Sequence, residues 1–467
     1  MMDLLIRNGY VYQQNGEFKR NDLAIKDGKI VSISSTNSAL TSKAYIDATG
    51  LYVLPGIIDS HVHFKEPAKH PESTENFFSG TSASAAGGVT TIIEMPNSYP
   101  CTYNKELLTR RRDIIQDQAV VDYALYGAAG NDHYAEIVPL GKEGIVAYKT
   151  FMHSAPKGRE DEYEGFTMTT DADLIQGFSE ISKTGLPLAV HAENDELITF
   201  FTQQVTDPAD FKSHLHVRNL VVETSAIHKL LYFAKQFNVP LIICHVSSPE
   251  ALALIKTAKE QGVRVYAETC PHYLIYDESY VEKLGPHGKC NPPLRSTEQV
   301  NKMWDFIRDG TIDYISSDHS PAFKADKEKW IGNILRSPAG FPGAELVLPL
   351  MLHQVAKGRL SLARVVQLLS ENPAKAFDLY PQKGSLQAGT DADITIVDLE
   401  AKKKIDSSQM ITRARDAAIL FDGLEIRGLP IYTIVRGHLV AKNGEIQPDV
   451  KGWGKWIEPQ KKASVQL

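Results

Sequence analysis

The sequence has little cysteine, no long apolar run and no excess of one charge, and each absence excludes a class of protein. Its four cysteines among 467 residues form no CxxC pair, so we expect no disulfide framework and a cytoplasmic, reducing environment. No window approaches the ~18 apolar residues of a membrane span, and Asp3 and Arg7 interrupt the N-terminus before a secretory signal develops. The net charge of −7 comes without a basic block, so neither nucleic acid nor a membrane is an expected partner.

The two ends of the chain share one texture, in which short alternating apolar runs are separated by Asn-Gly or Asp-Gly pairs. It appears in "VYQQNGEF" and "LAIKDGKIVSI" and returns in "DADITIVDL" and "YTIVRGHLVAKNGEI". Such pairs between apolar runs favour β-hairpins. We therefore expect a small β-sandwich domain formed by residues 1–54 and 380–447. Residues 448–467 show no clear period and are expected to be a C-terminal extension, either docked or partly loose.

Between these ends, residues 55–379 alternate buried-looking strands with helical stretches. The eight expected strands are "LPGIIDSHVHF", "VTTIIEMPN", "VDYALYGAAG", "GIVAYKTFM", "LPLAVHAEN", "VPLIICHVSS", "VRVYAETCPH" and "IDYISSDHS". From Ile57 to Ile315 they recur about every 37 residues, which suits a repeated strand–helix unit. Near-continuous apolar strands indicate a parallel sheet covered on both faces. The expected fold class is α/β, a (β/α)₈ TIM barrel, with another doubly wound sheet as the alternative.

Polar residues lie at the ends of five of these strands. In such barrels the chemistry gathers at the carboxyl ends of the strands. Side chains alternate along a strand, so the two histidines of the "HVH" motif face the same way and can reach one metal ion. A single histidine here would be read as a hydrogen-bonded core residue, but a matched set predicts a metal site. The predicted ligands are His61, His63, Lys149, His191, His245 and Asp318.

Imidazoles with a carboxylate suit zinc, although iron, manganese or cobalt accept the same donors. Lys149 is the unusual member of the set. It could instead form a structural ion pair or extend outward with its stem buried. An ammonium beside two divalent ions is strongly disfavoured, whereas a buried amine of lowered pKa can react with CO₂. The product, a carbamate, would be a carboxylate-like bridge.

The chain resembles the cyclic amidohydrolases, the family of allantoinase, dihydroorotase and hydantoinase (dihydropyrimidinase). The resemblance rests on "DSHVHFKEP", "GGVTTIIEMPN", "AYKTFM", "HAEN", "HVSSPE", "AETCPHYL", "KCNPPLR" and "SSDHSP", and it spans nearly the whole chain. It implies two metal ions, usually zinc, held by the six ligands named above with Lys149 N6-carboxylated. It also implies a homo-oligomer, a tetramer or a dimer.

The resemblance also implies a reaction. A hydroxide shared by the two metal ions would attack a ring amide carbonyl, and the second ion would stabilise the oxyanion. Asp318, matching the family's catalytic aspartate, would take the proton from that hydroxide and pass it to the departing ring nitrogen. Some relatives of hydantoinase have lost their metal ligands and act as scaffolds. Because all six ligands are present here, a non-catalytic scaffold is the minor alternative.

Which ring is opened depends on residues outside the ligand set. Dihydroorotases resemble this chain at Asn97, but they have an arginine where Lys65 stands and a histidine where Ala322 stands. Hydantoinases usually have a tyrosine at the position of Ser154. The motifs look most like allantoinase, although Lys65 and Asn291 depart from it. We therefore expect hydrolysis of allantoin to allantoate, with dihydroorotase-type or hydantoinase-type activity as the alternative.

Four residues are candidate substrate contacts: Lys65, Asn97, Ser154 and Asn291. Amide side chains at a barrel mouth can both donate and accept hydrogen bonds. Each amide could equally form a local turn hydrogen bond. Lys65 could either meet a substrate anion or ureide oxygen, or pair with a neighbouring carboxylate such as Glu66.

Overall fold

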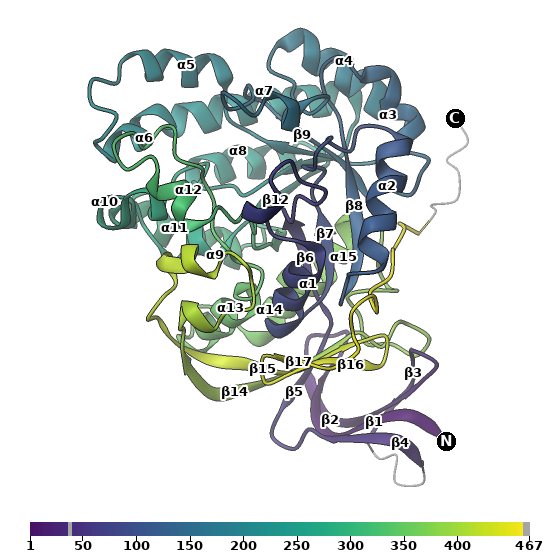
Figure 1. The fold of residues 1–467 in the computed structure, drawn as a ribbon. Coiled ribbons are helices and arrows are strands. Elements are labelled where there is room, and N and C mark those ends of the chain that lie inside the picture. The colour runs from purple at the N-terminus through teal and green to yellow at the C-terminus, as the bar shows by residue number, and fades with distance from the viewer. Residues whose placement is uncertain (36–39, 461–467) are drawn as a thin grey trace.

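The structure, a computed structural model, describes residues 1–35 and 40–460. Eight parallel strands form one sheet in the order β13-β12-β11-β10-β9-β8-β7-β6, which confirms the expected barrel (Figure 1). They are β6 (Ile57–Val62), β7 (Val89–Glu94), β8 (Asp122–Ala128), β9 (Ala147–Phe151), β10 (Leu188–His191), β11 (Leu241–Ile243), β12 (Val265–Thr269) and β13 (Tyr314–Ile315).

The first and last barrel strands meet only beyond the end of β13. Val62 and His319 form an isolated parallel bridge, and the amide of His63 donates to the carbonyl of His319 at 2.8 Å. The barrel is therefore nearly closed, and the closing contact lies at the strand ends where the polar residues gather. Every residue of β6, β7 and β8 is buried, as expected for a parallel sheet covered on both faces.

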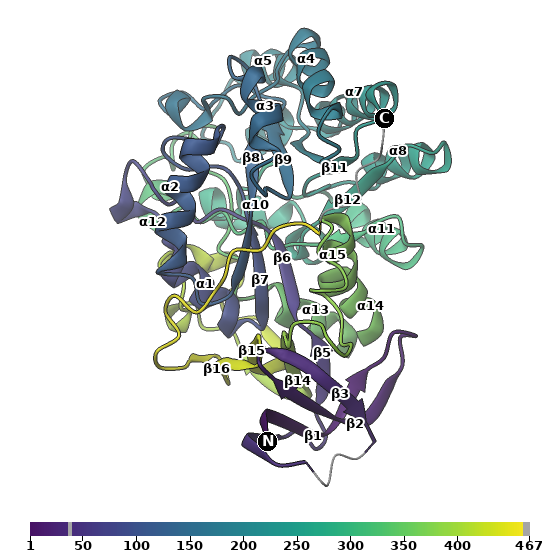
Figure 2. The ribbon, with the colours of Figure 1, turned by 90° about the vertical axis from the view of Figure 1, so that its right-hand side faces the viewer.

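Helices cover the outside of the barrel (Figures 1 and 2). They are α1 (Phe77–Ala86), α2 (Lys105–Gln116), α3 (Tyr134–Leu140), α4 (Asp171–Ser182), α5 (Asp195–Gln203), α6 (Lys212–Val217), α7 (Leu220–Phe237), α8 (Pro249–Glu260), α9 (Pro271–Ile275), α10 (Ser279–Leu284), α11 (Thr297–Arg308), α12 (Lys324–Glu328), α13 (Val347–Ala356), α14 (Leu362–Val366) and α15 (Asn372–Ala376). Within the described part of the chain, none of them is long and apolar enough to cross a membrane.

Local sequence sets the ends of these helices. The hydroxyl of Ser248 accepts from the amide of Ala251 at the start of α8, and Pro249 occupies its first turn. α7 ends at Asn238, whose φ of 53° is left-handed, a conformation that asparagine tolerates. Both helices lie between expected strands, where the sequence predicts helical stretches.

A second sheet lies below the barrel and contains strands from both ends of the chain (Figure 1). Its order is β17-β16-β15-β14-β5-β1-β2-β3, with β4 paired to β1. The antiparallel pairing of β5 with β14 joins the two chain ends. The strands are β1 (Met2–Tyr12), β2 (Phe18–Lys26), β3 (Lys29–Ser34), β4 (Ser42–Asp47), β5 (Tyr52–Pro55), β14 (Ile394–Lys404), β15 (Glu425–Val435), β16 (His438–Lys442) and β17 (Glu445–Ile446).

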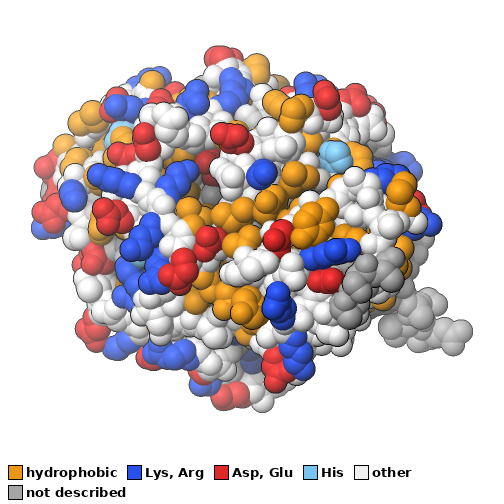
Figure 3. All heavy atoms as spheres, turned by 90° about the horizontal axis from the view of Figure 1, so that it is seen from below, with side chains coloured by type: hydrophobic (Ala, Val, Ile, Leu, Met, Phe, Trp, Pro, Cys, Tyr) orange, Lys and Arg blue, Asp and Glu red, His pale blue; other side chains and the backbone are white. Residues whose placement is uncertain are grey.

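Figure 3 shows the molecule from below, where charges of both signs surround a hydrophobic area. Tyr10 and Tyr45 of this sheet are 41% and 54% exposed. Tyr10 stacks on Tyr52, with ring centroids 5.2 Å apart. No single charge sign dominates this face, in agreement with the mixed charge of the sequence.

The segment after β17 runs back across the barrel toward α15 (Figure 2). Tyr123 of β8 donates its amide to the carbonyl of Lys455 at 2.9 Å, and its carbonyl accepts from the amide of Ile457 at 2.8 Å. The described part of the expected C-terminal extension is thus docked, adding a short parallel bridge to the barrel at Trp456. Residues 461–467, the rest of that extension, lie outside the described residues.

A buried ion cluster joins the barrel to the second sheet. The ammonium of Lys383 contacts the carboxylates of Asp122, Asp391 and Asp393, and the lysine side chain is 1% exposed. Burial opposes the charge on Lys383, but the three carboxylates outweigh it and raise the lysine pKa. Arg436 adds a second cation to Asp122 at 3.0 Å.

Replacing Lys383 with methionine should lower the free energy of unfolding by roughly 3–5 kcal/mol, because it leaves three buried carboxylates short of a cation. Denaturant unfolding followed by circular dichroism measures the loss. The matched control is Lys302→Met, which removes an exposed pair with Glu298 and should change stability little. Equal stability of the two variants would show that the cluster does not hold the barrel to the sheet.

Candidate functional site

The barrel brings the predicted strand-end residues together in one buried group. His61 lies in β6 and His63 follows it directly, while Lys149 lies in β9 and His191 ends β10. His245 follows β11 and Asp318 follows β13. All six residues are at most 9% exposed. Their placement is a consequence of parallel strands, whose carboxyl ends all open on the same face.

One half of the group contains His61, His63 and Asp318. The Nε2 atoms of the two histidines lie 3.1 Å apart, and each lies 3.3 Å from Oδ1 of Asp318. Two imidazole nitrogens and a carboxylate oxygen therefore converge on one point, which is the arrangement that the "HVH" spacing predicts.

The outer nitrogens of these two histidines are held by other side chains. Nδ1 of His61 donates to Glu268 at 2.6 Å, and Nδ1 of His63 donates to the amide oxygen of Asn97 at 2.9 Å. Burial opposes protonation of His61, but Glu268 and Asp318 outweigh it and raise its pKa to about 10. Burial lowers the pKa of His63 to about 3. Burial also opposes the charge on Asp318, yet the surrounding imidazoles hold its pKa well below the usual range.

The other half of the group contains His191 and His245. Nδ1 of His191 lies 3.1 Å from Nε2 of His245, and Nε2 of His191 donates to Glu193 at 2.6 Å. Arg218 donates to the same oxygen of Glu193. Burial lowers the pKa of both histidines well below the usual value, so both rings are neutral and can act as ligands.

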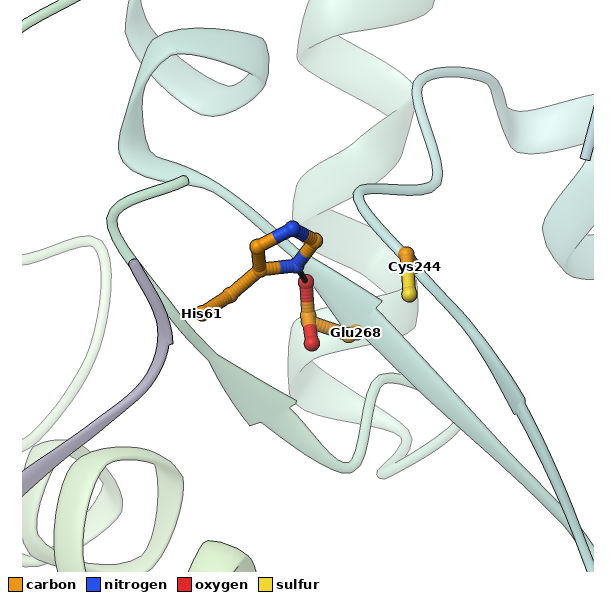
Figure 4. A group of neighbouring side chains, drawn as sticks. All are labelled: His61, Cys244 and Glu268. Carbon is orange, nitrogen blue, oxygen red and sulfur yellow. Dashed lines mark hydrogen bonds and ion pairs between the residues drawn. The ribbon is translucent and has the colours of Figure 1, made fainter. Parts of the chain in front are cut away.

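Lys149 lies on the floor of the site and is fully buried. Its ammonium donates to the thiol of Cys244 at 2.9 Å, with no carboxylate partner among the described residues. Figure 4 shows Cys244 beside the hydrogen-bonded pair of His61 and Glu268, which come from different strands. A structural ion pair was the simplest non-functional explanation for Lys149. Because the described residues give it no carboxylate partner, that explanation is excluded.

Backbone conformation helps to aim three of the polar residues. Lys65, His245 and Asp318 have φ angles of 61°, 38° and 46°, which are left-handed values uncommon for residues other than glycine. Such conformations concentrate at functional sites, where surrounding structure maintains the strain. Here they turn the chain sharply at the strand ends.

These observations test whether the residues suit a pair of metal ions. The inner nitrogens of His61 and His63 meet Oδ1 of Asp318, and those of His191 and His245 meet each other. The outer nitrogens of three of these rings bond to Glu268, Asn97 and Glu193. Carboxylate and carbonyl partners of this kind fix the tautomer and orientation of metal-binding histidines. Glu268 and Glu193 each keep one buried oxygen without a hydrogen-bond partner among the described residues. The residues fit a metal-binding site.

The four predicted substrate contacts lie in different settings. Asn97 bonds to His63, as described, and the amide oxygen of Asn291 is buried with no hydrogen-bond partner within the described chain. Lys65 is half-buried at the mouth of the site, and burial lowers its pKa to about 8. The hydroxyl of Ser154 instead donates to Asp195 at 2.8 Å, beside the start of α5. A substrate contact by Ser154 stays a prediction.

Several residues of the site were not predicted from the sequence. Glu193 and Glu268 bond to ligand histidines, and each lies within a motif quoted above. Their position near the end of a strand, beside a predicted ligand, was the sequence feature that could have identified them. His153, four residues after Lys149, is buried with its ring 4.8 Å from that of His191. Nδ1 of His153 donates to the carbonyl of Ser154 at 2.8 Å, and burial lowers its pKa to about 4. No spacing rule pointed to it.

Comparison with known proteins agrees with this site. Residues 52–440 match the model of the amidohydrolase family. An L-hydantoinase of Paenarthrobacter aurescens is 34% identical over 460 residues, covering 98% of each chain. An allantoinase of Solibacter usitatus is 32% identical over 464 residues, also covering 98% of each chain.

Solved structures give the same result. The L-hydantoinase (dihydropyrimidinase) of Arthrobacter aurescens superposes with a TM-score of 0.91 at 34% identity, covering 98% of this chain and 100% of that one. A dihydropyrimidinase of Brevibacillus agri superposes with a TM-score of 0.88 at 29% identity, covering 99% and 100%. Sequence, fold and site agree, and the chain therefore belongs to the amidohydrolase family as a cyclic amidohydrolase, an enzyme that acts on cyclic amides.

Proposed function

We propose that this enzyme opens the ring of a cyclic ureide, with allantoin as the substrate and allantoate as the product. The observation that carries the proposal is the convergence of four imidazoles, a carboxylate and a buried lysine at one end of the barrel. The predicted ligands His61, His63 and Asp318 would hold one divalent ion, and His191 and His245 the other. Lys149, as its carbamate, would serve both.

We infer zinc as the metal, because imidazole nitrogens with a carboxylate suit it. When bound, a pair of such ions supplies a water of lowered pKa and polarises the scissile carbonyl. Glu268, Asn97 and Glu193 hold the imidazole rings in place through their outer nitrogens. Asp318 takes up the proton of the attacking water and delivers it to the ring nitrogen that leaves.

Asn97 and Asn291 are the proposed contacts to the ring amides. The unpartnered amide oxygen of Asn291 supports this role, because a ring N–H would satisfy a buried acceptor that otherwise lacks a hydrogen bond. Asn97 supports it through its bond to His63, which places it against the metal ligands.

A hydantoinase activity is the second candidate, and one observation favours it. The L-hydantoinase of Paenarthrobacter aurescens is 34% identical to this chain, against 32% for the allantoinase of Solibacter usitatus, and the solved L-hydantoinase superposes with a TM-score of 0.91. Both enzymes open a five-membered ring containing two N–H groups, so the same metal ligands would serve either reaction. The substrates of the two enzymes differ in the substituent that the ring carries.

We also propose that the enzyme works as a homodimer or homotetramer in the reducing cytoplasm. The four cysteines support the reducing cytoplasm, because all are buried and unpaired in the structure. The homo-oligomer is proposed from the family resemblance of the sequence.

Ring opening of allantoin, hydantoin and dihydroorotate by the zinc-loaded protein, measured side by side, tests the proposed function. We expect kcat/KM for allantoin to exceed that for dihydroorotate by about 100-fold, since the site lacks the arginine fork that grips a carboxylate in two places. Preferential opening of dihydroorotate would contradict the assignment. A purified, folded protein that retains no metal would instead favour the scaffold alternative.

A further inference from the structure

His319 directly follows Asp318 and is fully buried, yet the proposed reaction gives it no role. Its carbonyl accepts from the amide of His63 at 2.8 Å, and its backbone forms a further bridge with Phe341. Asp318 has a left-handed φ of 46°, a conformation that the surrounding structure must maintain. Whatever holds His319 in place therefore also helps to hold the carboxylate of Asp318.

The ring of His319 is contacted on both of its nitrogens. Nδ1 accepts from the amide of Ala344 at 3.2 Å, so the proton of the ring lies on Nε2. Nε2 lies 3.5 Å from Oε2 of Glu75 and has no hydrogen-bond partner among the described residues. The ring also packs in a T-shaped contact with Phe64, with centroids 5.5 Å apart. The one N–H of the ring therefore lies beside the carboxylate of Glu75.

Glu75 lies just before α1 and is 1% exposed. The hydroxyl of Thr412 donates to Oε2, the same oxygen that faces His319, and the hydroxyl of Ser79 donates to Oε1. The amide of Arg413 also donates to Oε1, at 3.3 Å. Hydrogen bonds of this kind favour the ionised form of a buried carboxylate. Two segments far apart in the sequence thus fix one acceptor behind the end of β13.

We propose that Glu75 is a positioning residue for Asp318 and acts through His319. Glu75 fixes the ring of His319, and the backbone of His319 fixes the end of β13 against His63. Asp318 is thereby held with Oδ1 3.3 Å from the inner nitrogens of two predicted ligands. This inference rests on the proposed function, because it needs Asp318 as a metal ligand and proton acceptor.

The position of this pair differs from that of the other carboxylate–histidine pairs in the site. In those pairs the imidazole is itself a predicted ligand. Both nitrogens of His319 instead face protein atoms, Glu75 on one side and Ala344 on the other, so neither is offered to a metal ion. Its influence passes through the backbone to Asp318, and losing Glu75 should therefore misplace that carboxylate.

Glu75→Gln, made in the full chain and loaded with zinc, removes the charge and keeps the size of the side chain. On the ring that the wild type opens fastest, we expect kcat to fall by about 10–100-fold while KM changes less than about threefold. We also expect zinc to pass about 10-fold faster to a chromogenic chelator, a measurement that does not depend on turnover.

Glu345→Gln is the matched control. It removes another half-buried carboxylate, which accepts from the amide of Ile411 at 2.8 Å in the segment that also contains Thr412. Both kcat and zinc release should stay at the wild-type values. An equal fall of kcat in this control, or wild-type behaviour of Glu75→Gln, would overturn the inference and leave the proposed function intact. A wild-type protein that opens none of the three rings named above would instead contradict the proposed function.

Two variants of His319 test the inference even if Glu75→Gln does not fold. Glutamine can place an N–H near the position of Nε2, whereas asparagine is too short to reach Glu75 but can still accept from Ala344. We expect kcat of His319→Gln to exceed that of His319→Asn by about 10-fold. Where Glu75→Gln folds, adding it to His319→Asn should lower kcat no further, because both changes break one contact. Equal kcat in the two His319 variants, or additive losses in the double variant, would overturn the inference.

Discussion

Replacing Asp318 with asparagine should lower kcat by about 10³–10⁴-fold while leaving the protein folded. The amide keeps the shape of the side chain but cannot accept the proton that the proposed reaction requires. Asparagine also tolerates the left-handed backbone of this position, where φ is 46°, so the strand end should be preserved. Steady-state kinetics on allantoin, with metal content measured on the same sample, gives the result.

The metal measurement separates the two roles proposed for Asp318. A variant that keeps two ions and loses activity has lost the proton acceptor, whereas a variant that loses an ion has lost a ligand. Asp305→Asn, which breaks an exposed pair with Arg308 on α11, is the control and should leave kcat unchanged. Activity within about 10-fold of wild type, with both ions retained, would mean that another group moves the proton.

Replacing Lys149 with alanine should reduce activity by more than about 10³-fold and lower the metal content below two ions per chain. Lys149 is fully buried, and its only hydrogen-bond partner among the described residues is the thiol of Cys244. The proposed carbamate of Lys149 would be a ligand of both ions. We therefore expect its loss to release metal, because Cys244 alone contacts the Lys149 amine by a hydrogen bond among the described residues. Metal analysis by atomic absorption measures this independently of activity.

Lys149→Met is the matched variant, since it keeps the length of the side chain and removes only the amine. Equal losses in the two variants would show that the amine is required. Added propionate should restore part of the activity of the alanine variant by supplying a carboxylate, and that recovery would indicate the carbamate. Unchanged metal content in both variants would show that Lys149 is not a ligand, and its burial beside Cys244 would then need another explanation.

Much of the barrel could be predicted because its signals are local. Each barrel strand is a short apolar run, and the helix limits follow from residues such as Ser248 and Pro249 that act within one turn. The ligand histidines were also predictable, since a strand's alternation fixes the direction of His61 and His63, and the fold places strand ends together.

Other parts of the site could not be predicted in this way. The direction of Ser154 depends on Asp195, 41 residues later, whose carboxylate binds the hydroxyl away from the candidate substrate contacts. The ring of His153 likewise contacts that of His191, which β10 brings beside it. A sequence pattern reports spacing along one element, and these contacts join different elements.

The sequence by itself determined the fold class and the expected metal ligands, because these depend on periodicity along strands and on residue types at strand ends. It indicated the reaction class through the resemblance of its motifs to the cyclic amidohydrolases. Only the tertiary structure decided which side chains bond to the outer nitrogens of the ligand histidines. Glu268 reaches His61 across 207 residues, and Asn97 reaches His63 from the segment after β7. Those neighbours are set by how the barrel closes, which no local pattern encodes.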